Sequence, residues 1–138
     1  LTAGSFRGVL DDPEADTSAG TMIFCSGKIF YELLQRRRDL KRTDLAILRL
    51  QQLYPFPQPH LTLVLARYKQ AQRWAWVQDE PENMGAWSFV RPRLEAFTGK
   101  PFTYIGRKEA STPATGFPHI YRRDQAEIID RAVGPKKG

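Results

Sequence analysis

Paired carboxylates follow an apolar run in the middle of the chain. The run 74–77 (Trp-Ala-Trp-Val) ends in Gln78-Asp79-Glu80, and a proline and a Gly-Ala-Trp step lead into a helical pattern. Two adjacent carboxylates can serve as a general acid and base, but no nucleophile or metal ligand stands near them in the sequence. We therefore favour a structural role for Asp79 and Glu80, in which they accept N–H bonds from the next helix or pair with arginine across a subunit interface.

A second candidate site is the turn Ser26-Gly27-Lys28, where a predicted strand opens into a helix. Free backbone N–H groups at such a position favour anions. The turn is not a P-loop, because Met22 stands where that motif needs glycine and Ile29 where it needs Ser or Thr. A tight turn with a solvated lysine is the favoured interpretation, and contact with a phosphate or acyl-CoA is the alternative.

Two arginines at the ends of predicted strands are the other anion candidates. Arg49 ends a buried strand, where an unpaired guanidinium is costly to desolvate. Asp79, Glu80 or a bound anion could satisfy it, and we favour the internal pair. Arg107 opens a long loop, 106–120, of a kind that tends to be functional or interfacial. Lys28, Arg49 and Arg107 together would suit the phosphates of an effector.

The elements that position these residues alternate along the chain. Apolar runs and helical spacing predict strands over 21–25, 44–50, 73–78 and 102–105, and helices over 28–39, 61–68, 87–97 and 121–132. This alternation predicts a largely parallel sheet covered by helices on both faces. Residues 1–20 are predicted to be an irregular interdomain linker, 21–133 the domain, and 134–138 a flexible tail.

Composition narrows the class of function. A chain of 138 residues fits one domain with a real core. The net charge of +6 is spread along the sequence without a zinc spacing or an RNA-binding aromatic motif, which disfavours nucleic acid as a partner. No apolar run reaches the roughly 18–20 residues that a membrane span needs. The single cysteine, Cys25, excludes an internal disulfide and is predicted to be an inert buried thiol. The start has neither Met nor a signal layout, so we expect a cut end inside a longer protein.

Five segments, in order and spacing, carry a family resemblance. They are FCSGKIFYEL (24–33), LRLQQLYPFP (48–57), QDEPENMGAWSF (78–89), YIGR (104–107) and STPATG (111–116). The chain resembles, over about residues 5 to 133, the carboxy-terminal domain of the first, decarboxylating component of the 2-oxoglutarate dehydrogenase complex. Ser5-Phe6-Arg7 with Asp11-Asp12 resembles the family's linker ahead of this domain.

The resemblance implies the transketolase C-terminal-like fold, a three-layer α/β sandwich. Its mixed, mostly parallel sheet has about five strands, with helices on both faces. It also implies a homodimeric parent oxidoreductase of the citric-acid cycle that uses thiamine diphosphate and magnesium to decarboxylate 2-oxoglutarate. The parent passes the succinyl group to a lipoyl-bearing acyltransferase. Its location would be the cytoplasm in a bacterium or the mitochondrial matrix in a eukaryote.

The same resemblance implies that two earlier domains hold the cofactor. No Gly-Asp-Gly metal motif stands in this chain, so we expect no catalytic residue, cofactor or metal in it and no activity from it alone. Its partners would be those preceding domains and a second subunit. Some family members respond to acetyl-CoA or to nucleotides such as AMP.

Departures from the family pattern leave alternatives open. Gln51 and Met84 stand where the family usually has Glu and Gln, and Asp79 replaces the commoner Glu. Near the end, His119-Ile120-Tyr121 replaces a Lys-Val-His stretch, so that histidine's role does not carry over to Tyr121. A sister enzyme acting on 2-oxoadipate is one alternative.

Three hypotheses follow for the chain itself. The first is a packing and interface domain, with an apolar face that includes Trp87 and Phe89 left exposed for a partner. The second adds an effector site at Lys28, Arg49 and Arg107. The third is a free-standing basic binding module.

Overall fold

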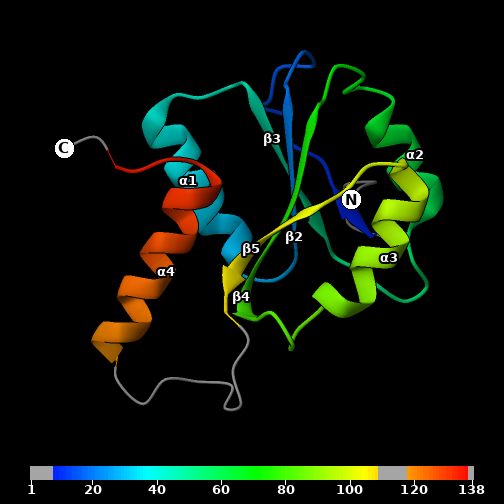
Figure 1. Ribbon diagram of the computed structural model, residues 1–138. Coiled ribbons are helices and arrows are strands. Elements are labelled where there is room, and N and C mark those ends of the chain that lie inside the picture. Colours follow the sequence, from blue (N-terminus) through cyan, green and yellow to red (C-terminus); the bar gives the residue numbers. More distant parts are fainter. Residues whose placement is uncertain (1–7, 109–117, 137–138) are drawn as a thin grey trace.

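A five-stranded sheet between two pairs of helices makes up the protein (Figure 1). The computed structural model describes residues 8–108 and 118–136. The elements are β1 (Val9–Leu10), β2 (Thr21–Cys25), α1 (Ile29–Leu40), β3 (Leu45–Leu50), α2 (Gln58–Leu65), β4 (Arg73–Pro81), α3 (Trp87–Thr98), β5 (Thr103–Arg107) and α4 (Pro118–Ala132). The α/β sandwich with a mixed, mostly parallel sheet is confirmed.

The strand order is β1-β3-β2-β4-β5, with only β1 antiparallel to its neighbour. The chain moves from β2 outward to β3, then crosses back to place β4 on the other side of β2. The sheet therefore has a switch point between β2 and β4. In open α/β sheets, ligands bind outside the carboxyl ends of the strands at such a point.

Helices α1 and α4 cover one face of the sheet (Figure 1). The core on this face is mainly aliphatic. Alternate residues of β2 and β3 point to this face, and the buried set is Ile23, Cys25, Ile29, Phe30, Leu33, Leu45, Ile47, Val77, Ile128, Ile129 and Val133. Helix α1 begins after Gly27, whose φ of +79° favours a residue without Cβ.

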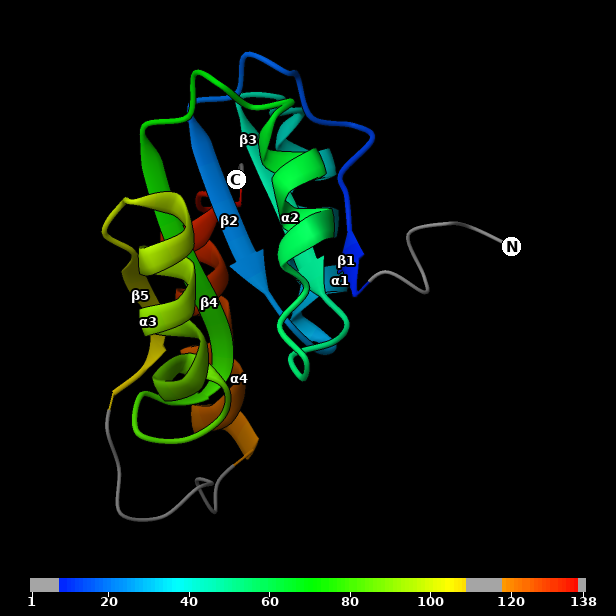
Figure 2. The same cartoon turned by 90° about the vertical axis from the view of Figure 1, so that its right-hand side faces the viewer.

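Helices α2 and α3 cover the opposite face (Figure 2). The core on this face is richer in aromatic side chains. Its largest buried members are Phe24, Tyr68, Trp76, Trp87 and Phe102, with Leu61, Val90 and Leu94 from the helices. Helix α3 ends at Gly99, which adopts φ +70°.

The segment predicted to be an irregular linker contributes to the sheet. Val9 pairs with Leu50 across β1 and β3, and Asp12 is only 1% exposed. Both carboxylate oxygens of Asp12 accept hydrogen bonds from the buried guanidinium of Arg37, and one also accepts from the Ile47 N–H. A two-residue strand is too short to leave a periodic signal, so the sequence analysis missed it. Where the domain begins within a longer protein stays a prediction.

The remaining element bounds differ by a few residues. The second helix was predicted over 61–68, but it begins at Gln58 and ends at Leu65, so that Tyr68 lies beyond it. Strand β4 extends to Pro81. At the predicted flexible tail, the Gly134 carbonyl accepts a hydrogen bond from Arg36 at 2.6 Å. Ser5, the motif 111–116 and most of the loop 106–120 lie outside the described residues.

Candidate functional site

The predicted site residues lie at the carboxyl edge of the sheet, where the four parallel strands end. Cys25 of β2 is in register with Arg49 of β3 and Val77 of β4. Side chains in register share a face, and so do residues two apart in a strand. Arg49 and Asp79 therefore project on the α1/α4 face, on either side of Cys25.

The turn from β4 into α3 is built around Gln78, which is 1% exposed. Its amide nitrogen donates to the carbonyls of Glu80, Pro81 and Met84, at 2.8–3.1 Å. Its amide oxygen accepts from the Trp76 indole at 2.9 Å and from the Trp87 N–H at 3.1 Å. The side chain thus fixes the strand end to the first residue of the helix. Sequence analysis missed this role, although Gln78 is the polar residue that ends the series 74, 76, 78 on one strand face.

Asp79 contributes to a polar cluster that joins four elements. Its carboxylate accepts a hydrogen bond from Gln125 of α4, whose amide nitrogen also donates to Glu32 of α1. Arg107 of β5 donates to the Asp79 carbonyl and to the Gln125 amide oxygen. These contacts attach α4 and α1 to the ends of β4 and β5. Gln125 carries no signal in the sequence, because nothing there indicates which helix reaches the sheet edge.

Glu80 and Gly85, which face each other, form the outer side of the same turn. Gly85 has φ +69°, and a Cβ placed there would lie 2.9 Å from the Glu80 Oε1 atom. Any other residue at position 85 would therefore meet strain in the backbone as well as the carboxylate. The Glu80 side chain is exposed, and its carbonyl accepts a hydrogen bond from Tyr104 at 3.1 Å.

The prediction that Arg49 forms an ion pair with Asp79 or Glu80 is wrong. The Arg49 guanidinium lies over the rings of Phe30 and Tyr31, at 5.7 and 5.2 Å from their centroids, and donates to the Tyr31 hydroxyl at 3.1 Å. Strand β2 separates β3 from β4, so the two side chains start about 10 Å apart. The Nε atom of Arg49 is buried and has no acceptor within the described chain.

The three basic residues proposed for anions are not brought together. Arg107 is engaged by Asp79 and Gln125, and two strands lie between it and Arg49 in the sheet order. Lys28 is exposed at the start of α1. It precedes Phe30 and Tyr31, on which Arg49 packs. An anion at this edge would therefore meet Arg49 and the Ser26-Gly27-Lys28 turn rather than all three cations.

The expected exposed face around Trp87 is also not as predicted. Trp87 is 5% exposed and packs in the α2/α3 core, with its ring 5.5 Å from that of Tyr104. Phe89 is partly buried under the Arg93 guanidinium, which lies 3.6 Å from its ring centroid, and its ring is 5.9 Å from that of Tyr54. Tyr54 itself is 83% exposed. Any interface on this side would thus centre on Tyr54 and Phe89.

Cys25 is fully buried, as expected. Burial raises the pKa of its thiol far above the usual range, and the neighbouring charge of Asp79 adds to this while Arg49 opposes it. The neutral thiol lies 3.7 Å from the Leu48 carbonyl. A thiol held protonated in this way is a poor nucleophile.

Across 8–108 and 118–136, His, Cys, Asp and Glu side chains nowhere gather in a group of three or more suited to a metal. None of the helices in these ranges combines the length and hydropathy that a bilayer crossing needs.

Comparison with known proteins agrees with the fold. The family described as 2-oxoglutarate dehydrogenase C-terminal matches residues 1–133. The chain belongs to this family. Its relatives include the 2-oxoglutarate dehydrogenase E1 component of Geobacillus kaustophilus, 38% identical over 94% of this chain. The oxoglutarate dehydrogenase of Buchnera aphidicola is 38% identical over 96% of it.

A third relative bears on substrate. The probable 2-oxoadipate dehydrogenase complex component E1 homolog of Dictyostelium discoideum is 38% identical over 90% of the chain. The chain spans only 14–15% of the length of these relatives. Identity over the 2-oxoglutarate dehydrogenase C-terminal region therefore does not separate the two substrates.

Proposed function

We propose that this chain is the C-terminal packing domain of a thiamine diphosphate-dependent 2-oxoglutarate dehydrogenase E1 component. The observation that carries the proposal is the family match over residues 1–133. The polar groups at the carboxyl edge support a packing role, because Asp79, Gln125 and Arg107 bond to one another within the domain.

The parent enzyme, in this proposal, decarboxylates 2-oxoglutarate and passes the succinyl group to a lipoyl-bearing acyltransferase. Thiamine diphosphate supplies the electron sink for decarboxylation and belongs, with its magnesium ion, to the preceding domains. This chain packs against those domains and a second subunit, in the bacterial cytoplasm or the mitochondrial matrix. A 2-oxoadipate dehydrogenase is the second reading of the parent, favoured by the Dictyostelium relative.

The test is an activity assay of the full-length protein that the complete coding sequence encodes, compared with a truncated protein that lacks this chain. We expect the full-length protein to decarboxylate 2-oxoglutarate in preference to 2-oxoadipate, and the 138-residue chain alone to release no CO₂ from either. We expect truncation before Gly8 to abolish the dimer and the activity together. A truncated protein that stays dimeric and fully active would overturn the packing role, and a preference for 2-oxoadipate would change the substrate.

A second function, effector binding, is favoured by one specific observation. Arg49 has no carboxylate partner in the described chain, and its buried Nε atom lacks an acceptor. An anionic group beside the Ser26-Gly27-Lys28 turn would meet the partly exposed end of the Arg49 guanidinium and Lys28. Acetyl-CoA and AMP are the ligands to try.

Calorimetric titration tests the effector site. We expect binding of acetyl-CoA or AMP that Arg49→Met weakens at least tenfold, whereas Arg93→Met leaves it unchanged. Arg93 is the matched control because it is also an arginine stacked on an aromatic ring, at Phe89. Absence of heat at millimolar ligand, or equal loss in both variants, would rule the site out.

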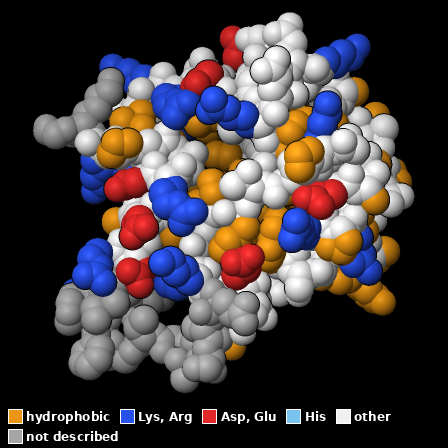
Figure 3. Space-filling model, in the orientation of Figure 1, with side chains coloured by type: hydrophobic (Ala, Val, Ile, Leu, Met, Phe, Trp, Pro, Cys, Tyr) orange, Lys and Arg blue, Asp and Glu red, His pale blue; other side chains and the backbone are white. Residues whose placement is uncertain are grey.

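The free-standing basic module finds less support. In Figure 3, basic and acidic side chains alternate on the face shown, where a nucleic-acid surface would carry one sign of charge. Retention on RNA or DNA with a steep salt dependence would be needed to revive this reading.

A further inference from the structure

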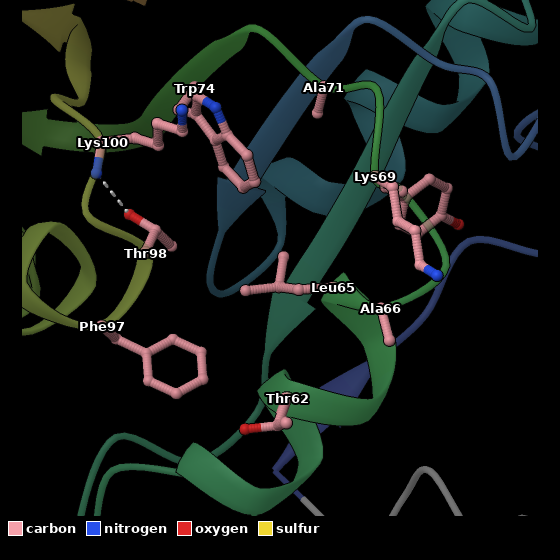
Figure 4. Close-up of a pocket in the computed structure, with 10 residues that line it drawn as sticks. Thr62, Leu65, Ala66, Lys69, Ala71, Trp74, Phe97, Thr98 and Lys100 are labelled. Atoms are coloured by element: carbon pink, nitrogen blue, oxygen red, sulfur yellow. Dashed lines mark hydrogen bonds between the residues drawn. The ribbon is translucent and has the colours of Figure 1, made fainter.

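An open groove lies between α2 and α3, at the amino ends of β2 and β4 and thus at the opposite end of the sheet from the carboxyl edge. Its volume is about 490 Å³, within the range of small-molecule sites. Leu65 and Ala66 at the end of α2, Phe97 at the end of α3, and Trp74 at the start of β4 line it together with Lys69 and Lys100. Figure 4 shows Phe97, Leu65 and the Trp74 ring around a shared open space.

The apolar wall of the groove is held in place by the core beneath it. The centroid of the Trp74 ring lies 6.3 Å from that of Phe24, on which it stacks, and 6.0 Å from that of Phe102. The rings of Phe24 and Phe102 are 5.4 Å apart. Phe24 is fully buried and Phe102 is 6% exposed. Trp74 therefore presents a fixed aromatic surface, and a ligand would meet a preformed site.

The polar groups of the groove that have no partner are all donors. The indole N–H of Trp74 is buried and has no acceptor within the described residues. Because this nitrogen is buried, it is not open to a ligand in the groove and serves only as a spectroscopic reporter of the ring. Lys69 and Lys100 are exposed at the rim and form no ion pair with any described carboxylate. No acidic residue lines the groove.

The three hydroxyl groups among the lining residues are already used, and that of Tyr68 donates to Asp11 at 3.0 Å. Thr62 donates to the Gln58 carbonyl at 2.9 Å, and Thr98 donates to the Leu94 carbonyl at 2.7 Å. The site therefore offers an aromatic and aliphatic wall and two cations at its rim. Its complement is an apolar molecule that carries a negatively charged acceptor.

We propose that this groove binds a small amphipathic carboxylate. The apolar body packs against Trp74, Phe97 and Leu65, and the carboxylate is attracted by Lys69 and Lys100. The class is an acyl or aryl monocarboxylate, because the groove has cationic groups at its rim and an apolar interior. This binding is independent of the proposed packing role, since none of these residues takes part in the polar cluster around Asp79.

Octanoate titrated into the ¹⁵N-labelled 138-residue chain tests the proposal, with 1-octanol as its neutral counterpart. The chain has three tryptophans, and Trp74→Phe identifies the Trp74 indole signal among them. We expect saturable movement of that signal with octanoate and at least fivefold weaker binding of octanol. Trp76 donates to Gln78 inside the protein, so its indole signal should stay in place.

Two variants separate charge from packing. Lys69→Gln with Lys100→Gln should weaken octanoate binding at least fivefold, whereas Lys41→Gln with Lys136→Gln, an equal loss of exposed charge elsewhere, should not. Leu65→Trp should block the groove to octanoate while the lysines remain. All four lysines are exposed, so the folded spectrum should persist in both lysine variants.

Three results would each overturn the proposal. The first is no saturable shift at millimolar octanoate, the second is equal binding of octanol, and the third is equal weakening by the two lysine pairs. None of these results would bear on the dehydrogenase assay, which measures the parent protein with its own substrate.

Discussion

The two faces of the sheet are covered by helix pairs that are held in different ways. On the α1/α4 face, narrow aliphatic side chains fill the core and the two helices contact each other. On the α2/α3 face, the core combines aliphatic side chains with the aromatic rings of Phe24, Tyr68, Trp76, Trp87 and Phe102, and a groove of about 490 Å³ remains between the helices.

The polar contacts that hold the helices also differ between the two faces. Arg36 of α1 reaches Asp130 of α4 and the Gly134 carbonyl, and Arg42 reaches the Val133 carbonyl. Gln125 and Glu32 join the same helices at the carboxyl edge. Helix α3 is instead tied to the sheet through Gln78 at one end. The difference indicates that the α1/α4 face serves cohesion, and the α2/α3 face has room for a ligand.

The largest expected effect comes from the buried ion pair between Arg37 of α1 and Asp12. Asp12→Ala should lower the free energy of unfolding by about 3–5 kcal/mol, because it leaves the Arg37 guanidinium buried without its partner. Asp44→Ala, which removes the exposed pair with Arg42, should cost at most about 1 kcal/mol. Urea unfolding of both variants measures the difference, and similar losses would show that burial of the Asp12 pair is unimportant.

A matched pair of truncations compares the packing of the two faces directly. Leu33→Ala, at a fully buried site on α1, should cost about 2–5 kcal/mol. Leu65→Ala should cost only about 1 kcal/mol, because Leu65 is partly buried and already borders open space. Thermal or urea unfolding gives both values. Equal costs would contradict the view that the α2/α3 face is the looser one.

Gln78→Ala tests the attachment of α3. The change removes the acceptor of the Trp76 and Trp87 N–H groups, and we expect a loss of about 2 kcal/mol. Gln35→Ala, which removes an exposed bond to Asp39, should change stability by less than about 0.5 kcal/mol. Hydrogen exchange at the start of α3 should also accelerate in the Gln78 variant. Unchanged exchange there would show that the helix is anchored elsewhere.

A further expected effect, confined to alkaline pH, is a pH dependence of stability at the loop that follows α2. Burial raises the pKa of Tyr68 to about 12, with Asp11 contributing, and the hydroxyl donates to Asp11 at 3.0 Å. Because the folded state keeps the proton longer than the unfolded state, with its ordinary pKa near 10, stability should fall as pH rises from about 10 to about 12.

Tyr68→Phe is the control for this pH dependence. The variant cannot lose a phenolic proton at this position, so its stability curve should fall less steeply over the same interval. Urea unfolding at several pH values provides the comparison. Parallel curves for the two proteins would show that Tyr68 does not titrate differently on folding.

Much of the fold could be predicted because its signals are local. The apolar run that forms β2 and the helical spacing that forms α1 lie next to the glycine that separates them. Strand β1 could not be found in this way, since two residues carry no period. Trp87 was expected to be exposed because an aromatic residue at a helix start gives no indication of which face it occupies.

The candidate site was predicted in location but not in its contacts. Parallel strands bring their carboxyl ends to one edge, so Arg49, Asp79 and Arg107 had to lie there. Which partner each side chain finds depends on strand order and on the helix that arrives from elsewhere. Arg49 therefore packs on Phe30 and Tyr31 instead of pairing with a carboxylate.

By itself the sequence determined the alternation of strands and helices, the mostly parallel sheet and the family, because these rest on short-range pattern and on motifs in a fixed order. Only the tertiary structure decided that Asp12 is buried against Arg37, that Gln125 joins Asp79 to Glu32, and that a groove opens at Trp74. These contacts join residues 25 to 93 positions apart or depend on the space between side chains. Such distances are fixed by the packing of the whole domain.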